Sequence, residues 1–487
     1  MNFKTSLKTY GLADLLSRSI GLITSPIITR LLSMQQYGAG ALLSGVWSPF
    51  ALAQYGGMDW AYPFYLARKK DKKEAQQLIA TASFVAYVSV LLVWAGFFIA
   101  ASSGGWLKSY AGVSQPELAF FILGLLPAAL IYWLCYLLRY LNLADSYVRI
   151  TLFGRIAPIV VVLPLLPYVA PEDRLLWSWG LGLVISFIAL IYALYEICRV
   201  GHWPFRRSLF STRIAREMLK YGVYLIPAGG TYAMISITDR LLVGYLIGTD
   251  GVALLVIGVA VGSIGTLFSG WFGLAFDPYL SKWIANDDQT SYLPKLQLLA
   301  NTLACGFSLL AALSVLWSQS LIDLLFTDSY LPSAPFVPLC IFAASLAVLS
   351  RIGVATALIA QSPKYHSVLY GASLVLNITV GLLLIPMIGV IGAILGTVAA
   401  EFLILVGWIY IGRVHSRNLP VRWLPAVCIL ISTALFIYLW TPKPALEISE
   451  LMTLIVQSLI LCATYMGALW LIIGRKEIIR LISYIRE

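Results

Sequence analysis

Nine charged side chains inside long apolar segments of this 487-residue chain are candidates for chemistry. A charged side chain at the centre of a bilayer costs about 2.5–3.5 kcal/mol on insertion scales, so each of these residues needs a reason. Arginine suits a phosphate group, because its planar fork offers paired hydrogen bonds and stays charged when buried. Carboxylates can carry a proton or bind a sodium ion. The arginines are Arg18, Arg30, Arg155, Arg240 and Arg351, and the carboxylates are Asp14, Asp59, Asp239 and Glu401.

The depth of these residues in their segments singles out some of them. At about 1.5 Å per residue along its segment, Arg18 lies roughly 14 Å inside the membrane, near the midplane of the bilayer. Arg351 and Glu401 reach a similar depth. These three are too deep to reach headgroups easily, and we predict that they are the strongest functional candidates. Asp14 lies four residues before Arg18 on the same helix face, so the two can pair directly, which is a structural alternative of equal weight.

The remaining charges are shallower and have simpler interpretations. Asp59 and Arg155 lie toward the inner side of the membrane. Asp239 and Arg240 are sequence neighbours near the outer side, where each can pair with another helix. Arg30 and Arg240 can also extend to the interface with the headgroups. We keep all five as candidates for a polar, slightly cationic cavity, the arginines for substrate binding and the carboxylates for ion coupling.

The elements that position these side chains are predicted to be transmembrane helices. The chain is 60% hydrophobic and 11% charged, against about 25% charged in an ordinary soluble domain. A spanning helix needs about 20 mostly apolar residues, whereas barrel strands would be about 10 residues long and alternating. The sequence therefore predicts an all-α membrane protein with about 14 spans, near 9–32, 38–66, 78–101, 116–139, 149–170, 174–198, 218–247, 251–280, 294–320, 333–360, 366–386, 388–411, 421–441 and 451–473.

Charge predicts the orientation of these spans. Cytoplasmic loops of multi-span proteins carry an excess of Lys and Arg. With the N-terminus inside, most of the 33 basic residues are cytoplasmic, including the clusters Arg68–Lys73 and Arg206–Arg216. This orientation places the C-terminus inside as well. The net charge of +11 then describes an inner face that meets anionic lipid, and we predict no nucleic-acid partner.

Two short clusters recur about halfway along the chain. LKTYG at 7–11 corresponds to LKYG at 219–222, and ITRLL at 28–32 corresponds to ITDRLL at 237–242. Both copies begin a helix that runs from the cytoplasm outward, so the repeat is parallel. Transporters are often built from two such halves, with the substrate path between them. We predict two six-helix lobes around a central cavity, 1–200 and 218–412, followed by an additional helix pair at 421–473.

Three stretches of the sequence resemble one family of membrane proteins. They are Tyr10–Leu32 followed by Ser33 and Tyr37–Gly38, KYGVYLIPAGGTYAMISITDRLLVGY at 220–245, and FTDSYLPSAPFVPL at 326–339. They are similar to the lipid-linked oligosaccharide flippases, the Wzx-like branch of the multidrug/oligosaccharidyl-lipid/polysaccharide exporter superfamily. The resemblance extends over most of the chain as diffuse patterns rather than as one invariant signature.

This resemblance implies a function and a location. It implies outward transfer of an undecaprenyl-pyrophosphate-linked repeat unit by alternating access, for O-antigen or capsule assembly in the bacterial inner membrane. A proton or sodium gradient would drive transfer. The expected partners are the lipid-linked oligosaccharide, the bilayer and polysaccharide assembly proteins. We expect no other cofactor and no metal site, since the six cysteines match no zinc or redox spacing.

Three other functions compete with this one. A peptidoglycan lipid-precursor flippase also has fourteen spans, but the charges here are scattered rather than clustered as arginines in the first lobe. A multidrug exporter of the superfamily usually has twelve spans. A membrane polysaccharide polymerase or glycosyltransferase usually needs an extended outer loop, and the longest outer loop, 102–115, offers only Lys108, with Glu117 at its edge. We therefore predict that the chain is not an enzyme.

Overall fold

The computed structural model describes most of the chain. The described residues are 20–21, 23–66, 68, 71–141, 143–201, 203–286, 289–359, 365–415, 424–439 and 448–473. Two predicted site residues, Asp14 and Arg18, lie outside them. The first predicted span, 9–32, is described only from residue 20, and its residues 23–31 are helical.

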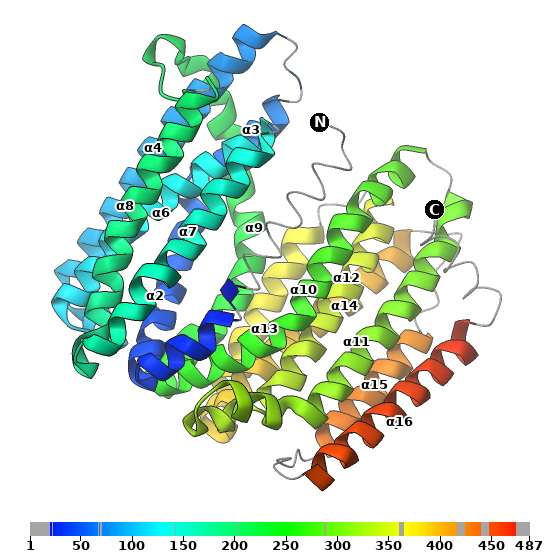
Figure 1. Cartoon of the computed structure of the whole chain (residues 1–487). Coiled ribbons are helices and arrows are strands. Elements are labelled where there is room, and N and C mark those ends of the chain that lie inside the picture. The colour runs from blue at the N-terminus through cyan, green and yellow to red at the C-terminus, as the bar shows by residue number, and fades with distance from the viewer. Residues whose placement is uncertain are drawn as a thin grey trace. The chain divides into compact units, whose positions relative to one another are not determined.

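The chain divides into two compact units between Ala253 and Leu254. Each unit is built from helices packed side by side (Figure 1). The helices numbered below 10 are α2 (Met34–Ala53), α3 (Met58–Leu66), α4 (Lys72–Ser103), α5 (Trp106–Ala111), α6 (Gln115–Tyr140), α7 (Ala144–Leu165), α8 (Arg174–Arg199) and α9 (Thr212–Leu246). The others are α10 (Thr249–Asn286), which begins just before the division, α11 (Gln289–Leu325), α12 (Phe336–Ile359), α13 (Tyr365–Ile388), α14 (Val390–His415), α15 (Leu424–Leu439) and α16 (Ile448–Ile473).

The predicted fold class, an all-α membrane protein, is confirmed. The regular structure of the described residues is helical throughout, and the helices coincide with the predicted spans. Among these residues, nine helical stretches are long and apolar enough to cross a membrane. The lobe boundaries predicted from the repeat remain a prediction; α9, which carries the second copy of the repeat, packs against α2 and α3 in the first unit.

Local polar sequences fix where several helices begin. Ser33 caps α2: its side chain accepts the Gln36 N–H, while the Gln36 side chain accepts the Ser33 N–H. Ser114 and Glu117 form the same reciprocal pair at the start of α6. Asp71 caps α4. Such caps satisfy backbone donors that the first helical turn leaves free, so a helix can begin at a defined residue next to the membrane.

One predicted span is wrong in detail, because residues 38–66 do not form a continuous helix. The chain leaves the helical conformation at residues 54–57, between α2 and α3. Gly56 and Gly57 adopt left-handed φ angles of 58° and 74°, which residues with a Cβ rarely tolerate. Gly57 also lies against Gly222 of α9, and a Cβ on either glycine would overlap the backbone of the other. The break therefore depends on two glycines and on the close approach of a third.

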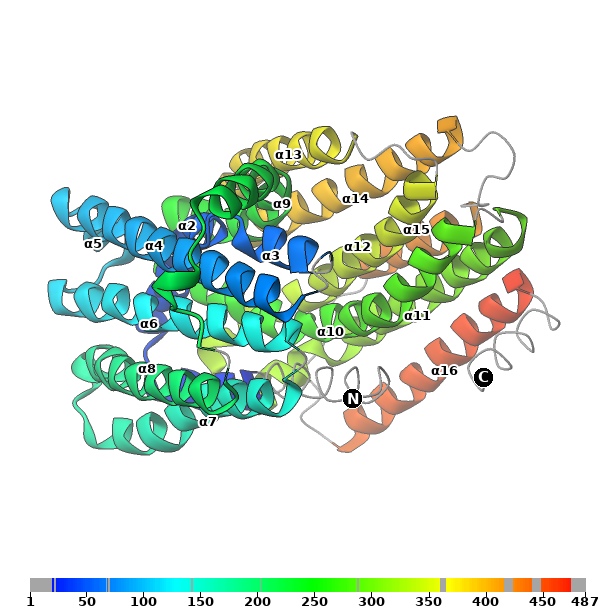
Figure 2. The ribbon, with the colours of Figure 1, turned by 90° about the horizontal axis from the view of Figure 1, so that it is seen from above.

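The first unit has two hydrophobic clusters along α6. In one, Met58, Tyr62 and Trp133 are buried together between α3, α4 and α6. The Trp133 indole donates to the Ser83 hydroxyl at 3.2 Å. The other cluster lies among α6, α7 and α8, which lie side by side in Figure 2. Helix α6 thus holds both sides of the unit together.

In the second unit, α11 is the central helix. It packs against α12, α15 and α16, while α14 packs against α12 and α13 (Figure 1). A buried apolar cluster joins α11, α12, α14 and α15. Glycines allow a close approach of α10 to α12, where Gly258 faces Phe336 and Gly262 faces Cys340. Small residues at such contacts are typical of helix packing in membranes, where the hydrophobic effect between helices is weak.

Candidate functional site

The break between α2 and α3 borders a cavity in the first unit. Its volume is about 440 Å³. Helices α2, α3, α6 and α9 contribute its walls. Backbone that is not helical is tolerated at membrane depth where it is buried in protein or lines a cavity, and the break meets this condition. We call this space the helix-break cavity; its lining includes Trp47, Gln54, Tyr55, Asp59, Trp60, Ala128, Ala129, Tyr132 and Gly230.

Two oxygen atoms at the helix-break cavity have unused hydrogen-bonding capacity. Asp59 lies in the first turn of α3. Its Oδ1 is buried and makes no hydrogen bond with the described part of the chain, and the same holds for Gln54 Oε1. A carboxylate and an amide oxygen offered to one cavity can bind a small cation.

Tyrosine hydroxyls fasten the break to α6. The Tyr136 hydroxyl donates to the Asp59 carbonyl. The Tyr55 hydroxyl donates to the Ala129 carbonyl at 3.0 Å. The first bond ends on a carbonyl in the first turn of α3 and the second joins Tyr55 of the break to a carbonyl of α6, so together they tie the break and the start of α3 to α6.

A second cavity, of about 460 Å³, lies among α6, α7 and α8. We call it the arginine cavity, because Arg139 of α6 and Arg155 of α7 both line it. Three tyrosines, Tyr132, Tyr136 and Tyr147, contribute aromatic surface and hydroxyl groups. The remaining lining includes Ile131, Cys135, Ile150, Thr151, Gly154, Pro158, Ile185, Ser186 and Ala189.

The two cavities adjoin each other across α6. Ala128 and Tyr132 line both of them. Tyr132 lies within electrostatic reach of both Asp59 and Arg139. A carboxylate, a tyrosine and a pair of arginines are thus arranged in sequence across α6. The arrangement can hold an anion at one end and a cation at the other.

The chemistry of the arginine cavity fits a phosphorylated ligand with flat or ring-shaped groups. Guanidinium groups bind phosphate through paired, charge-assisted hydrogen bonds. Tyrosine rings offer a rigid apolar face with a polar tip, which suits a ligand that is apolar on one side and hydroxylated on the other. The cavity is within the usual size range of small-ligand sites.

Of the sequence-predicted candidates, the structure brings Asp59 and Arg155 to the adjoining cavities. Sequence reasoning missed Arg139 and Gln54. Arg139 lies in the last turn of α6, so it was counted among the cytoplasmic helix ends. Gln54 carries no charge, and its one available signal was its position two residues before a Gly-Gly pair.

Two further predicted residues lie in the second unit. Arg351 of α12 is exposed and Glu401 of α14 is buried. Tyr370 of α13 lies within electrostatic reach of both. The similar depth predicted for Arg351 and Glu401, like their roles, stays a prediction.

The remaining candidates lie elsewhere in the first unit. Arg240 is partly buried, within electrostatic reach of Asp239 and of Tyr37, and its side chain lies against Gly45 of α2. These contacts favour the structural interpretation of the Asp239 and Arg240 charges. Arg30 is exposed at the end of the segment that precedes α2.

Comparison with known proteins gives structural relatives only. No protein-family model matches the sequence, and no curated protein matches it either. The structure is similar to an inward-facing multidrug resistance MATE family transporter of the MOP superfamily, with 15% identity, a TM-score of 0.63, and coverage of 82% of this chain and 94% of that one. It is similar to the lipid II flippase MurJ in an inward closed conformation, with 14% identity, a TM-score of 0.62, and coverage of 94% and 98%. A Vibrio cholerae MATE transporter gives 12% identity, a TM-score of 0.56, and coverage of 85% and 98%.

These likenesses cover nearly the whole length of each neighbour and show the fold. The chain has the fold of the MOP superfamily, that is, of the multidrug/oligosaccharidyl-lipid/polysaccharide exporters predicted from the sequence. It is a multi-pass membrane protein. The neighbours are transporters and a flippase, and none of the three is an enzyme by its description.

Proposed function

We propose that the protein is a flippase of the Wzx-like branch. It would move a polyprenyl-pyrophosphate-linked oligosaccharide from the inner to the outer leaflet of a bacterial inner membrane, for O-antigen or capsule assembly. The observation that carries this proposal is the arginine cavity, in which Arg139 and Arg155 converge with three tyrosines. The fold supports transport by alternating access, because its neighbours include transporters and a lipid flippase.

Each part of such a substrate has a suitable environment. The pyrophosphate would bind Arg155 and Arg139, the first sugar would pack against the tyrosine rings, and the prenyl chain would remain in lipid. Arg139 ends α6 on the side that the charge pattern places in the cytoplasm. Substrate would therefore enter from the inner leaflet, with both chain termini in the cytoplasm. Polysaccharide assembly proteins would supply the substrate and receive the product.

Removing the two guanidinium groups tests this function. In the double variant Arg139→Ala, Arg155→Ala, we expect the rate of transfer to fall by at least about a hundredfold, since each charge-assisted hydrogen bond contributes about 1.5–3 kcal/mol. The measurement is the appearance of a fluorescent undecaprenyl-pyrophosphate oligosaccharide on the opposite leaflet of proteoliposomes.

Arg213→Ala is the matched control, because Arg213 is 89% exposed and pairs only with Glu217 among the described residues. We expect it to transfer substrate at the wild-type rate. Wild-type transfer by the double variant would exclude the arginine cavity as the binding site. If wild-type protein extends the sugar chain instead of moving it, the protein is a polymerase; if it moves lipid II or drugs alone, it belongs to another branch of the superfamily.

We further propose that transfer is coupled to a proton or sodium gradient through Asp59. Asp59 and Gln54 both line the helix-break cavity, and Tyr132 lines this cavity and the arginine cavity. In Asp59→Asn, we expect transfer to lose its dependence on the gradient, because the amide can neither take up a proton nor neutralise a cation. Proteoliposomes with an imposed sodium gradient or an imposed pH gradient separate the two ions.

Glu401→Gln is the comparison for this experiment, since Glu401 is the buried carboxylate of the second unit and the other strong candidate. Loss of gradient dependence in Glu401→Gln alone would move the coupling site to the second unit. Unchanged gradient dependence in both variants would leave neither carboxylate with a coupling role.

A further inference from the structure

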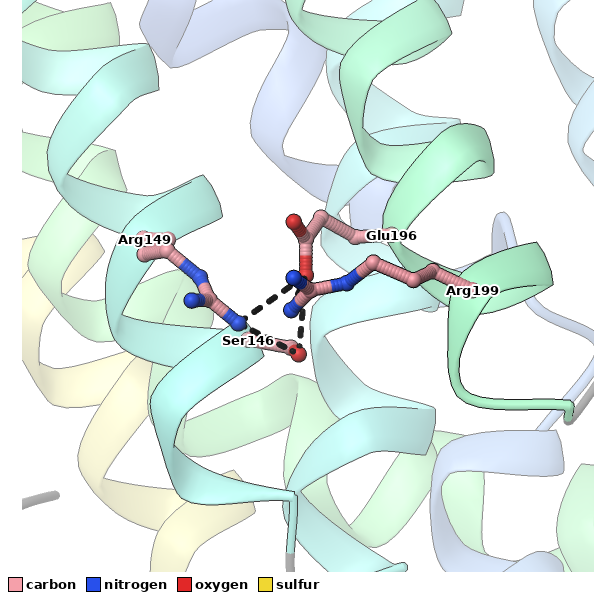
Figure 3. Close-up of polar contacts among 4 residues, drawn as sticks. All are labelled: Ser146, Arg149, Glu196 and Arg199. Carbon is pink, nitrogen blue, oxygen red and sulfur yellow. Dashed lines mark hydrogen bonds and ion pairs between the residues drawn. The ribbon is translucent and has the colours of Figure 1, made fainter.

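A cluster of charged side chains outside both cavities has no role in the proposed transfer. Glu196 of α8 is buried, with only 4% of its side chain exposed. Its Oε2 accepts from Arg149 of α7 at 3.1 Å, from Arg199 at 2.9 Å and from the Ser146 hydroxyl at 3.0 Å. Figure 3 shows these donors from two helices converging on one carboxylate oxygen. We call these four residues the arginine clamp.

The arginine clamp carries more positive charge than its carboxylate neutralises. Two guanidinium groups face one buried carboxylate, which leaves a net charge of +1. The two arginine side chains are 45% and 46% exposed. Within the described part of the chain, only the Nη2 atom of each arginine makes a hydrogen bond or ion pair. The N–H groups of Nε and Nη1 therefore remain available to donate to a ligand. The Glu196 carboxylate thus orients the two guanidinium groups and leaves most of their N–H donors available.

The position of the arginine clamp places those donors where membrane phosphates lie. Arg199 is in the last turn of α8, and Arg149 lies near the start of α7. The charge pattern assigns this end of both helices to the cytoplasmic side. Lys and Arg at that interface meet anionic headgroups. The C-terminal end of α8 carries a partial negative charge, which favours a cation such as Arg199 there.

We propose that the arginine clamp is a binding site for a lipid-borne phosphate group. Two preoriented planar forks suit a tetrahedral oxyanion, whose oxygens each accept from more than one N–H. A phosphate would neutralise the surplus charge that Glu196 leaves. Two sources supply this chemistry at the inner leaflet: the headgroup of an anionic phospholipid, and the pyrophosphate of the proposed substrate before it enters the arginine cavity.

Lysine variants distinguish a site that requires the planar guanidinium groups from one that requires only positive charge. In Arg149→Lys, Arg199→Lys, both charges and their attraction to Glu196 remain, but the planar forks are lost. We expect at least about a tenfold weaker binding of the lipid, as expected for loss of a charge-assisted hydrogen bond. The measurement is native mass spectrometry of full-length protein from zwitterionic phosphatidylcholine nanodiscs, with titrated phosphatidylglycerol in one arm and undecaprenyl pyrophosphate in the other.

The control is Arg213→Lys, which makes the same change at an exposed cytoplasmic pair, and we expect it to bind lipid like the wild type. Weaker phosphatidylglycerol binding by the lysine variant identifies a structural phospholipid site. Weaker undecaprenyl pyrophosphate binding by the lysine variant identifies a loading site. Equal binding by wild type and the lysine variant in both arms would overturn the proposal. Melting temperatures in pure phosphatidylcholine establish that each variant is folded. If the double lysine variant is not folded, the single variants Arg149→Lys and Arg199→Lys, each of which keeps one arginine on Glu196, repeat the test.

Discussion

Gly222→Ala is expected to prevent the first unit from folding as described. The added Cβ would overlap the backbone of Gly57, and backbone cannot move aside as a side-chain end can. Overpacking a well-packed interior typically costs about 1–3 kcal/mol, and an overlap with backbone belongs at or above the upper end of that range. We expect a lower melting temperature and loss of transfer in proteoliposomes together.

Gly96→Ala is the matched control for this substitution. Gly96 lies within α4, and a Cβ there would meet nothing within 4 Å. Alanine is the better helix former, so this variant is expected to melt at or slightly above the wild-type temperature. If Gly222→Ala and Gly96→Ala behaved alike, the contact between α9 and the break would not be as close as described.

Removing both arginines of the arginine clamp is expected to destabilise the first unit strongly. In Arg149→Ala, Arg199→Ala, Glu196 stays buried with only the Ser146 hydroxyl as a described partner. An uncompensated buried charge costs about 3–5 kcal/mol, far more than the loss of an exposed ion pair. The measurement is chemical or thermal unfolding of the purified protein in nanodiscs.

A third substitution distinguishes the buried charge from lost side-chain packing. Adding Glu196→Gln to the double variant removes the uncompensated charge while keeping the shape, so we expect most of the lost stability to return. Failure to recover would mean that the arginine side chains stabilise by packing rather than by charge. Arg213→Ala, at an exposed pair, is expected to change stability by less than about 1 kcal/mol.

Hydropathy predicted the helices well, because crossing a bilayer requires long apolar segments whatever their packing. The break at residues 54–57 was missed for the same reason: Gly56 and Gly57 are apolar enough to leave the hydropathy of 38–66 undisturbed. The Gly-Gly pair was a visible signal, but two glycines can also lie within a membrane helix. What makes them a break is the approach of Gly222, which lies more than 160 residues further along the chain.

The sequence predicted the types of residue in the cavities better than their positions. Asp59 and Arg155 were candidates because a charge inside an apolar segment is visible without a structure, although their shallower position ranked them below Arg18, Arg351 and Glu401. Arg139, Arg149 and Glu196 lie at helix ends, where charges are common and usually face water. Only the packing of α6, α7 and α8 shows that Glu196 is buried and that Arg139 lines a cavity.

Tyr132, which lines both cavities, has a consequence for how two ligands affect each other. One side chain cannot adopt different rotamers for two neighbouring spaces, so a ligand that fixes the ring from one side sets the shape of the other side. Thermodynamic linkage makes this effect reciprocal. If a cation in one cavity changes the affinity for an anionic ligand in the other by some factor, the anionic ligand changes the affinity for the cation by the same factor. A single phenol ring can thus couple two binding equilibria.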